Sequence, residues 1–79
     1  MVRVQEIRTA KDLLKATTPL IRLLQRHMWL DYDQDADVLY VHFEETPSSN
    51  HSEMREDGII LDYREKTLVG LTILDASQR

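Results

Sequence analysis

The sequence predicts a single α+β domain in which a kinked N-terminal helix packs on a four-stranded antiparallel β-meander formed by two hairpins. Three observations support this fold class. Apolar residues recur at helical spacing in the first third of the chain, and they alternate with polar residues in two later stretches, 28–44 and 59–75. At 79 residues the chain has length for only one hydrophobic core. We therefore assign residues 1–79 to one domain, with a helical N-terminal extension over 1–28 and a β-sheet core over 29–79.

The helical part is predicted from a stripe of apolar side chains three or four residues apart. The stripe consists of Leu13, Leu14, Thr17, Leu20, Ile21, Leu24 and Met28. Thr9 can cap the first turn, with Asp12 at the third helical position. Pro19 interrupts the pattern, because proline lacks an N–H donor and collides with the preceding turn of a helix. We expect helical segments over Thr9–Thr17 and Pro19–His27, as two helices or as one kinked unit.

The sheet is predicted from alternation with a period of two between turn-forming residues. The four expected strands are residues 28–33, Val38–Glu44, Ile59–Arg64 and Leu68–Asp75. Met1–Ile7 alternates loosely and is expected to be a short strand or an ordered arm. Glu45–Asp57 contains serine, asparagine and proline with little to bury, so it is predicted to be a surface loop. The pair Asp57-Gly58 supplies a turn, and Gly70 inside the last strand indicates a bulge or a close backbone approach.

The two faces of this sheet differ in character. One face is fully apolar and is expected to lie under the helix; its residues are Leu39, Val41, Phe43, Val69, Leu71 and Ile73. The other face is expected to carry Trp29, Val38, Tyr40, His42, Leu68, Thr72 and Leu74. Such a face is too apolar for open contact with water, and large exposed apolar patches usually mark interfaces. We expect these seven residues to form an interface, unless residues 1–8 or the long loop fold over them.

Four acidic residues match part of a calcium-binding loop. Asp33, Asp35, Asp37 and Glu44 have the spacing of its first, third, fifth and twelfth positions. The sixth position is Val38 instead of the glycine that the sharp turn requires, and the residues that follow alternate as a strand. These carboxylates are therefore expected to cap the hairpin by accepting hydrogen bonds from backbone amides, and no metal site is assigned.

The remaining candidates for chemistry are histidines and serines. The spacing of His27, His42 and His51 fits no metal-binding motif, and each is interpreted as structural or solvated. The chain has no cysteine, no glycine-rich phosphate loop and no serine in the context of a nucleophile elbow. The sequence thus predicts no catalytic or cofactor-binding residue, no cofactor and no enzyme. The alternative is a small hydrolase or nuclease in which His42 and nearby carboxylates, such as Glu44, act as acid and base.

The charge and composition of the chain limit the classes of partner that it can bind. The formal net charge is −4, which disfavours nucleic acid as a partner for this chain by itself, since phosphate neutralisation supplies most of that affinity. Arg3, Arg8, Lys11 and Lys15 form a basic N-terminal cluster that is interpreted as the solvated side of the helix. The absence of cysteine, of a long apolar run and of a secretory signal favours a cytoplasmic protein without a membrane span.

Three blocks of sequence carry a resemblance to a known family. They are Asp31–Val41 (DYDQDADVLYV), Asp57–Tyr63 (DGIILDY) and Leu68–Ser77 (LVGLTILDAS). The chain from Trp29 onwards resembles small bacterial and archaeal proteins grouped as domain of unknown function 2283, and its segment 17–22 (TTPLIR) is similar to cyanobacterial members. The resemblance implies a small β-rich fold without an established activity or assigned site residues. Some relatives look like the antitoxin-side partner of a two-gene toxin and antitoxin pair.

The sequence as a whole favours a non-catalytic protein–protein interaction module. The acidic balance and the surplus apolar sheet face predict a homo-oligomer, or a subunit that binds a protein encoded nearby, including an antitoxin-like subunit. The N-terminal extension is expected to act either as a lid on the sheet or as a binding arm. A small-molecule or metal-sensing module is a third class, and it requires a concave pocket that so few elements rarely enclose.

Overall fold

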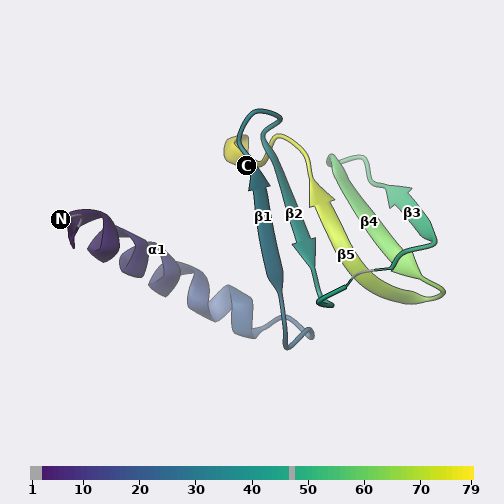
Figure 1. Cartoon of the computed structure of the whole chain (residues 1–79), viewed down its shortest axis with the longest axis horizontal. Helices are drawn as coiled ribbons and strands as arrows, with labels where there is room; N and C mark the ends of the chain where they lie inside the picture. The colour runs from purple at the N-terminus through teal and green to yellow at the C-terminus, as the bar shows by residue number, and fades with distance from the viewer. Residues whose placement is uncertain (1–2, 47) are drawn as a thin grey trace.

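The computed structural model describes residues 3–46 and 48–79, which form one helix, a five-stranded sheet and a terminal 3₁₀ turn (Figure 1). The elements are α1 (Arg3–Ile21), β1 (Trp29–Asp33), β2 (Val38–His42), β3 (His51–Met54), β4 (Ile59–Arg64), β5 (Thr67–Ile73) and η1 (Ala76–Gln78). The α+β class is therefore confirmed. The prediction of four strands is wrong, because β3 lies in the stretch that was expected to be a loop.

The additional strand β3 is polar, which explains why the alternation pattern missed it. Its sequence, HSEM, is exposed throughout, and it pairs antiparallel with β4 from His51 opposite Tyr63 to Met54 opposite Ile60. Main-chain hydrogen bonds to β4 hold this edge strand in place. A hairpin of this kind forms without a buried face on its outer strand, so its side chains carry little signal.

The order of strands in the sheet is β1-β2-β5-β4-β3, and all neighbours are antiparallel. This corrects the predicted simple meander, in which β2 would lie beside β4. The chain leaves β2, crosses to the far edge of the sheet and returns through β3 and β4, so that β5 closes against β2. The amide of Phe43 donates to the carbonyl oxygen of Val69 at 3.0 Å and extends this central pairing.

The helix also differs from its prediction. It runs without a break from Arg3 to Ile21, so the expected strand or arm over Met1–Ile7 is helical from Arg3, and residues 1–2 lie outside the described part. Thr9 does not cap the helix, because its hydroxyl donates to the carbonyl of Gln5 at 2.9 Å within the helix. Pro19 lies in the last turn, where one donor is lost shortly before the helix ends, and the predicted segment to His27 is instead irregular.

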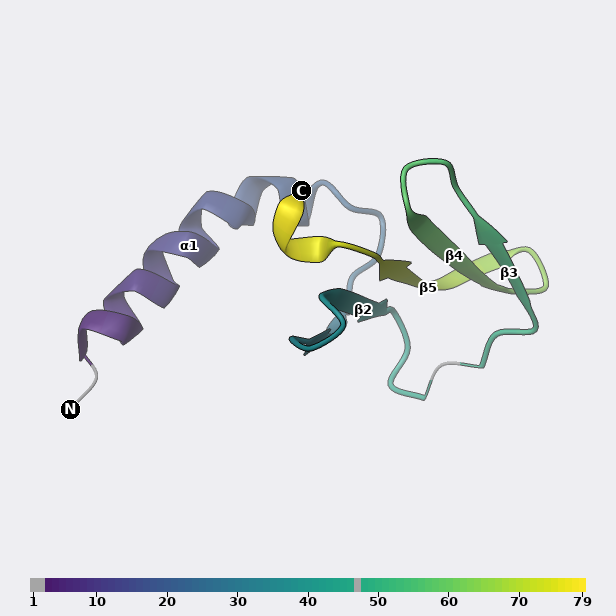
Figure 2. The same ribbon diagram turned by 90° about the horizontal axis from the view of Figure 1, so that it is seen from above.

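The helix does not cover the sheet, which corrects the predicted packing. In two views at right angles, α1 extends away from the edge of the sheet that β1 forms (Figures 1 and 2). Nearly all of its described side chains are exposed, including Leu13 and Leu14. A stripe of apolar residues indicates that a helix packs on a partner surface, but it does not indicate which surface that is.

The chain consequently buries little of its apolar surface. Among the described residues only Val38, Val41 and Val69 are buried apolar side chains. The accessible surface is 6757 Å², whereas a compact monomer of 9.3 kDa exposes about 5,000 Å². The radius of gyration is 14.4 Å, against about 11.6 Å for a compact chain of this length. The isolated chain therefore carries a surplus of about 1,800 Å² of surface.

Candidate functional site

The face of the sheet that was predicted to lie under the helix is apolar across four strands. Residues paired across antiparallel strands point to the same side, so the strand registers define its rows. One row is Leu30, Val41, Leu71 and Leu61, and the next is Tyr32, Leu39, Ile73 and Ile59. We call these eight residues the apolar face. Leu30 and Tyr32 at the β1 edge are exposed, Val41 is buried, and the other five are partly buried.

The opposite face carries most of the seven residues predicted to form an interface. Trp29 pairs with His42 and Tyr40 pairs with Thr72, so these four share a side. Trp29 and Tyr40 are exposed, Val38 is buried, and the others, including Leu68 and Leu74, are partly buried. The same rows also carry Asp31 and Asp62, which makes this face more mixed than the alternation alone indicates. Its role as an interface stays a prediction.

The helix presents a second apolar surface. On α1 the side chains of Ile7, Leu13, Leu14, Leu20 and Ile21 fall within one arc of the helical circumference, whereas Arg8, Asp12 and Lys15 fall on the other side. We call these five apolar residues the helix stripe. All five are exposed, and Leu14 retains 73% of its accessible surface. Helices in proteins owe most of their stability to packing of such a stripe. Within the described chain, α1 has no partner surface except near Leu20 and Ile21 at its C-terminal end.

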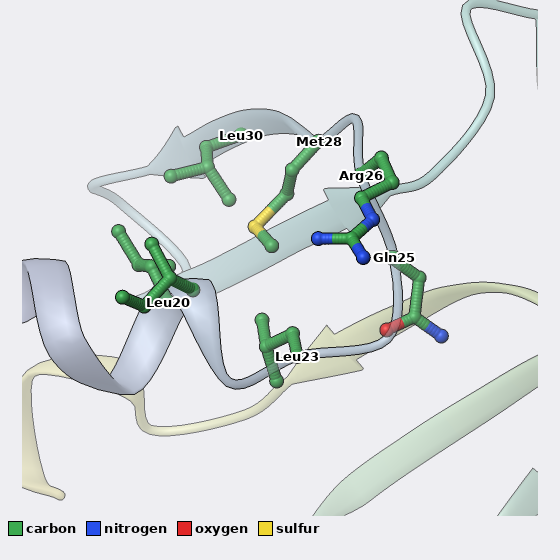
Figure 3. A pocket seen from close by; sticks show the side chains of 7 residues that line it. Leu20, Leu23, Gln25, Arg26, Met28 and Leu30 are labelled. Atoms are coloured by element: carbon green, nitrogen blue, oxygen red, sulfur yellow. The ribbon is translucent and has the colours of Figure 1, made fainter.

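A hollow lies where the helix meets the sheet (Figure 3). It has a volume of about 390 Å³ and is lined by Leu20, Ile21, Leu23, Gln25, Arg26, Met28 and Leu30. Leu20 and Leu23 point toward Met28 and Leu30 from the opposite wall (Figure 3). The amide of Leu23 donates to the carbonyl of Leu20 at 3.1 Å and ends the helix. The linker 22–28 thus lies against the β1 edge and directs α1 outward.

Asp37 is the centre of a hydrogen-bonded cluster that joins the β1–β2 turn to η1. Its carboxylate accepts hydrogen bonds from the Tyr32 hydroxyl at 2.7 Å, and from the amide and hydroxyl of Ser77 at 2.9 and 2.8 Å. These bonds, led by that from Tyr32, hold the pKa of Asp37 below its ordinary value of 3.8. The same bond to Asp37 raises the pKa of Tyr32. Asp33 accepts a bond from the amide of Ala36 at 3.2 Å, as the predicted capping role requires.

A bidentate ion pair joins strands that are not neighbours. Arg64 at the end of β4 donates through both terminal nitrogens to the carboxylate of Glu44, which follows β2. The pair therefore links the two strands that flank β5. The hydrogen bonds from Arg64 hold the pKa of Glu44 below its ordinary value, and those to Glu44 raise the pKa of Arg64. The Glu44 carboxylate is therefore engaged in an ion pair that holds the sheet together.

The histidines lie apart from one another. His42 on β2 and His51 on β3 are separated by three strand spacings, about 14 Å, and the registers place them on opposite faces. His51 lies 3.3 Å from Glu53, and His27 stacks on Trp29 with ring centroids 6.4 Å apart. His27 was predicted to end a helix, but it lies in the linker. In the described ranges, no three His, Asp or Glu side chains are grouped as a metal site would require.

The two parts of the chain carry opposite charge. Residues 1–28 contain six Lys and Arg against two Asp and Glu, a formal charge of +4, whereas residues 29–79 contain four against twelve, a formal charge of −8. Most of these acids lie in turns and loops at the ends of the strands, such as Asp35, Glu45, Glu56 and Glu65. The ends of the strands, at the two margins of the apolar face, are therefore predominantly acidic. The sequence contained this signal, which becomes visible once the chain is divided at residue 28.

By its fold the chain is a small α+β protein, a five-stranded antiparallel sheet preceded by one helix that extends from its edge. Residues 29–77 match the family described as "Protein of unknown function (DUF2283)", which is more than half of the chain. The chain belongs to this family, and the resemblance predicted from three sequence blocks is confirmed. Neither a comparison with curated proteins nor one with solved structures finds a match. The matched segment contains the whole sheet, and α1 lies outside it.

None of the helices in the described part of the chain combines the length and apolar character that a membrane crossing needs.

Proposed function

We propose that this protein is a non-catalytic protein-interaction module whose apolar face and helix stripe are covered by another protein surface. The observation that carries the proposal is the surplus of about 1,800 Å² of accessible surface relative to a compact monomer of the same mass, together with the many large apolar side chains that are exposed. Contiguous apolar surface with a charged rim is the usual composition of a protein interface.

The ionisable groups support a binding role over a catalytic one. Catalytic groups usually converge on one site and have a pKa shifted toward the operating pH. Here the pKa of Asp37 and that of Glu44 are lowered by bonds to structural partners, and His42 and His51 lie far apart. The family resemblance adds one candidate partner, the product of a neighbouring gene in a toxin and antitoxin pair.

The proposal is tested with the full chain and two matched variants. Light scattering gives the mass in solution, and co-purification with the product of the neighbouring gene tests a second partner. Leu30→Gln alters the apolar face, and Trp29→Gln alters the adjacent position on the opposite face. Both residues are partly exposed, so both variants are expected to fold, which circular dichroism checks.

Association is expected to weaken in Leu30→Gln and to persist in Trp29→Gln. Loss of association in Trp29→Gln alone also supports an interaction module, but one that uses the face predicted from the sequence. A wild-type chain that is monomeric at all concentrations, and that binds no product of a neighbouring gene, would overturn the proposal.

A further inference from the structure

We infer that the occupant is a second copy of this chain, and that the two copies exchange helices: α1 of each protomer lies with its helix stripe on the apolar face of the other. This inference rests on the proposed function and specifies its partner. Within the described residues the helix stripe approaches the apolar face only at the hollow, where Leu20 and Ile21 lie near Leu30. The rest of the stripe has no partner surface, and the rest of the apolar face has no helix over it.

The dimensions of the two surfaces match. The 19 residues of α1 span about 28 Å, and five strands place the outer two about 19 Å apart. One helix is thus long enough to cross the whole sheet. The path of the linker 22–28 opposes contact within the same chain, since Leu23 and Met28 line the hollow with Leu30 while α1 extends away from its own sheet.

Charge favours the same pairing. In the exchanged arrangement a segment of charge +4 approaches a sheet domain of charge −8 in the other copy, and this occurs twice in the dimer. On α1, Lys11 lies beside the helix stripe and remains at the rim when the stripe is covered, whereas Arg8 and Lys15 lie on the opposite side and contribute only to the attraction at longer range. The acids at the ends of the strands supply the opposite charge there.

The area agrees with a permanent dimer. If each copy buries its surplus of about 1,800 Å², the interface totals about 3,600 Å², which lies in the range of obligate homodimers. A two-fold axis makes the exchange reciprocal, so both helices and both sheets are covered and the assembly closes as a dimer.

The experiment uses the absence of cysteine from the natural chain. One copy carries Leu14→Cys in the helix stripe, and a second copy, marked by a tag of different mass, carries Leu61→Cys in the apolar face. The two are mixed, allowed to exchange and treated with a short bis-maleimide. Lys15→Cys, one residue along and on the polar side of the helix, replaces Leu14→Cys as the matched control. Leu30→Cys, in the same row as Leu61 and exposed, is the second sheet variant if Leu61→Cys does not fold.

The expected result is a mixed-mass product that forms several-fold more from Leu14→Cys than from Lys15→Cys, in a protein whose mass by light scattering is twice that of one chain. The cross-link is expected to weaken as salt screens the charges. A dimer that yields only products between two Leu14→Cys copies means that helices pair with helices. That result overturns the exchange while the interaction function stands.

Two results distinguish failure of the helix exchange from failure of the proposed interaction function. A monomer that binds the neighbouring gene product overturns the exchange alone and leaves the interaction function standing. A monomer in which Leu14→Cys and Leu61→Cys on the same chain cross-link efficiently, and which binds no partner, overturns both, because its own helix then covers the sheet.

Discussion

At the scale of single residues, Asp37 connects three separate parts of the chain. It has a left-handed backbone conformation with φ of 55°, which aspartate tolerates better than most residues. Its carboxylate binds Tyr32 and Ser77, and its carbonyl accepts the amide of Ala76 at 2.9 Å. The C-terminal turn therefore depends on one side chain of the first hairpin. The sequence indicated that these acids cap a turn, but not that one of them reaches a residue forty positions later.

This cluster predicts a dependence of stability on pH. Because the folded state lowers the pKa of Asp37, its contribution is present above the ordinary value of 3.8 and is lost as pH falls through the lower folded pKa. Asp37→Asn keeps the shape and the tolerance of positive φ but removes the charge. The variant is expected to melt at a lower temperature than wild type at neutral pH, with a gap that narrows in acid.

Thermal melts between neutral pH and strong acid measure this gap. Asp35→Asn is the control, since the Asp35 carboxylate accepts no hydrogen bond within the described part of the chain. A constant gap between wild type and Asp37→Asn at every pH would show that the charge of Asp37 does not stabilise the fold. The raised pKa of Tyr32 predicts a second change in stability at alkaline pH. The contribution of Tyr32 to stability is present below its ordinary pKa of 10.0 and is lost as pH rises through its raised folded pKa.

At the scale of secondary-structure elements, local sequence patterns predicted the features that depend on neighbouring residues, namely most strands and turns. Alternation located β1, β2, β4 and β5 within one or two residues, and the turn at Gly58 is confirmed by its φ of +83°. The polar strand β3 was missed because backbone pairing and polar side-chain contacts, such as that of Ser52 with Asp62, hold it without apolar alternation. The strand order and the direction of α1 were also missed, since both depend on contacts between segments distant in sequence. An apolar stripe on a helix can pack on a surface of its own chain or on a surface of another chain, so the pattern does not identify the partner.

Gly70 shows how closely the two halves of the sheet approach. A Cβ atom at this position would lie 2.8 Å from the carbonyl oxygen of Val41 on the neighbouring strand, which is backbone and cannot rotate away. The predicted close approach is thus confirmed, and a register shift between Asp62 and Tyr63 accompanies it. Gly70→Ala is expected to lower the free energy of unfolding by about 1–3 kcal/mol, because β5 must move away from β2.

Urea unfolding of the full chain measures this loss. Thr72→Ala, on the same strand and the same face, is the control, and it is expected to cost less because it removes atoms instead of adding them. An equal or smaller loss in Gly70→Ala would mean that the strands separate without strain.

At the scale of the whole molecule, folding and association are expected to be one process. The described chain has three buried apolar side chains and an accessible surface of 6757 Å², and a domain of this size is marginal even when compact. In the proposed dimer, covering the apolar face and the helix stripe would supply the missing burial. In the same dimer the basic helix and the acidic sheet would be complementary parts of one interface, which would account for the uneven distribution of charge in a chain of net charge −4.

Coupled folding and association predict a melting temperature that rises with protein concentration, since dimer formation stabilises only the folded state. A hundredfold increase in concentration is expected to add about 2.8 kcal/mol per mole of dimer, a shift of several degrees for a domain of this size. Leu14→Lys places a charge in the exposed helix stripe and is expected to remove the dependence, because the charge would have to be buried on association. Lys15→Ala, on the polar side, is expected to retain it. Calorimetry across that range decides the matter: a wild-type melting temperature that does not change with concentration would mean that the single chain is stable alone and that its exposed apolar surfaces are not joined on folding.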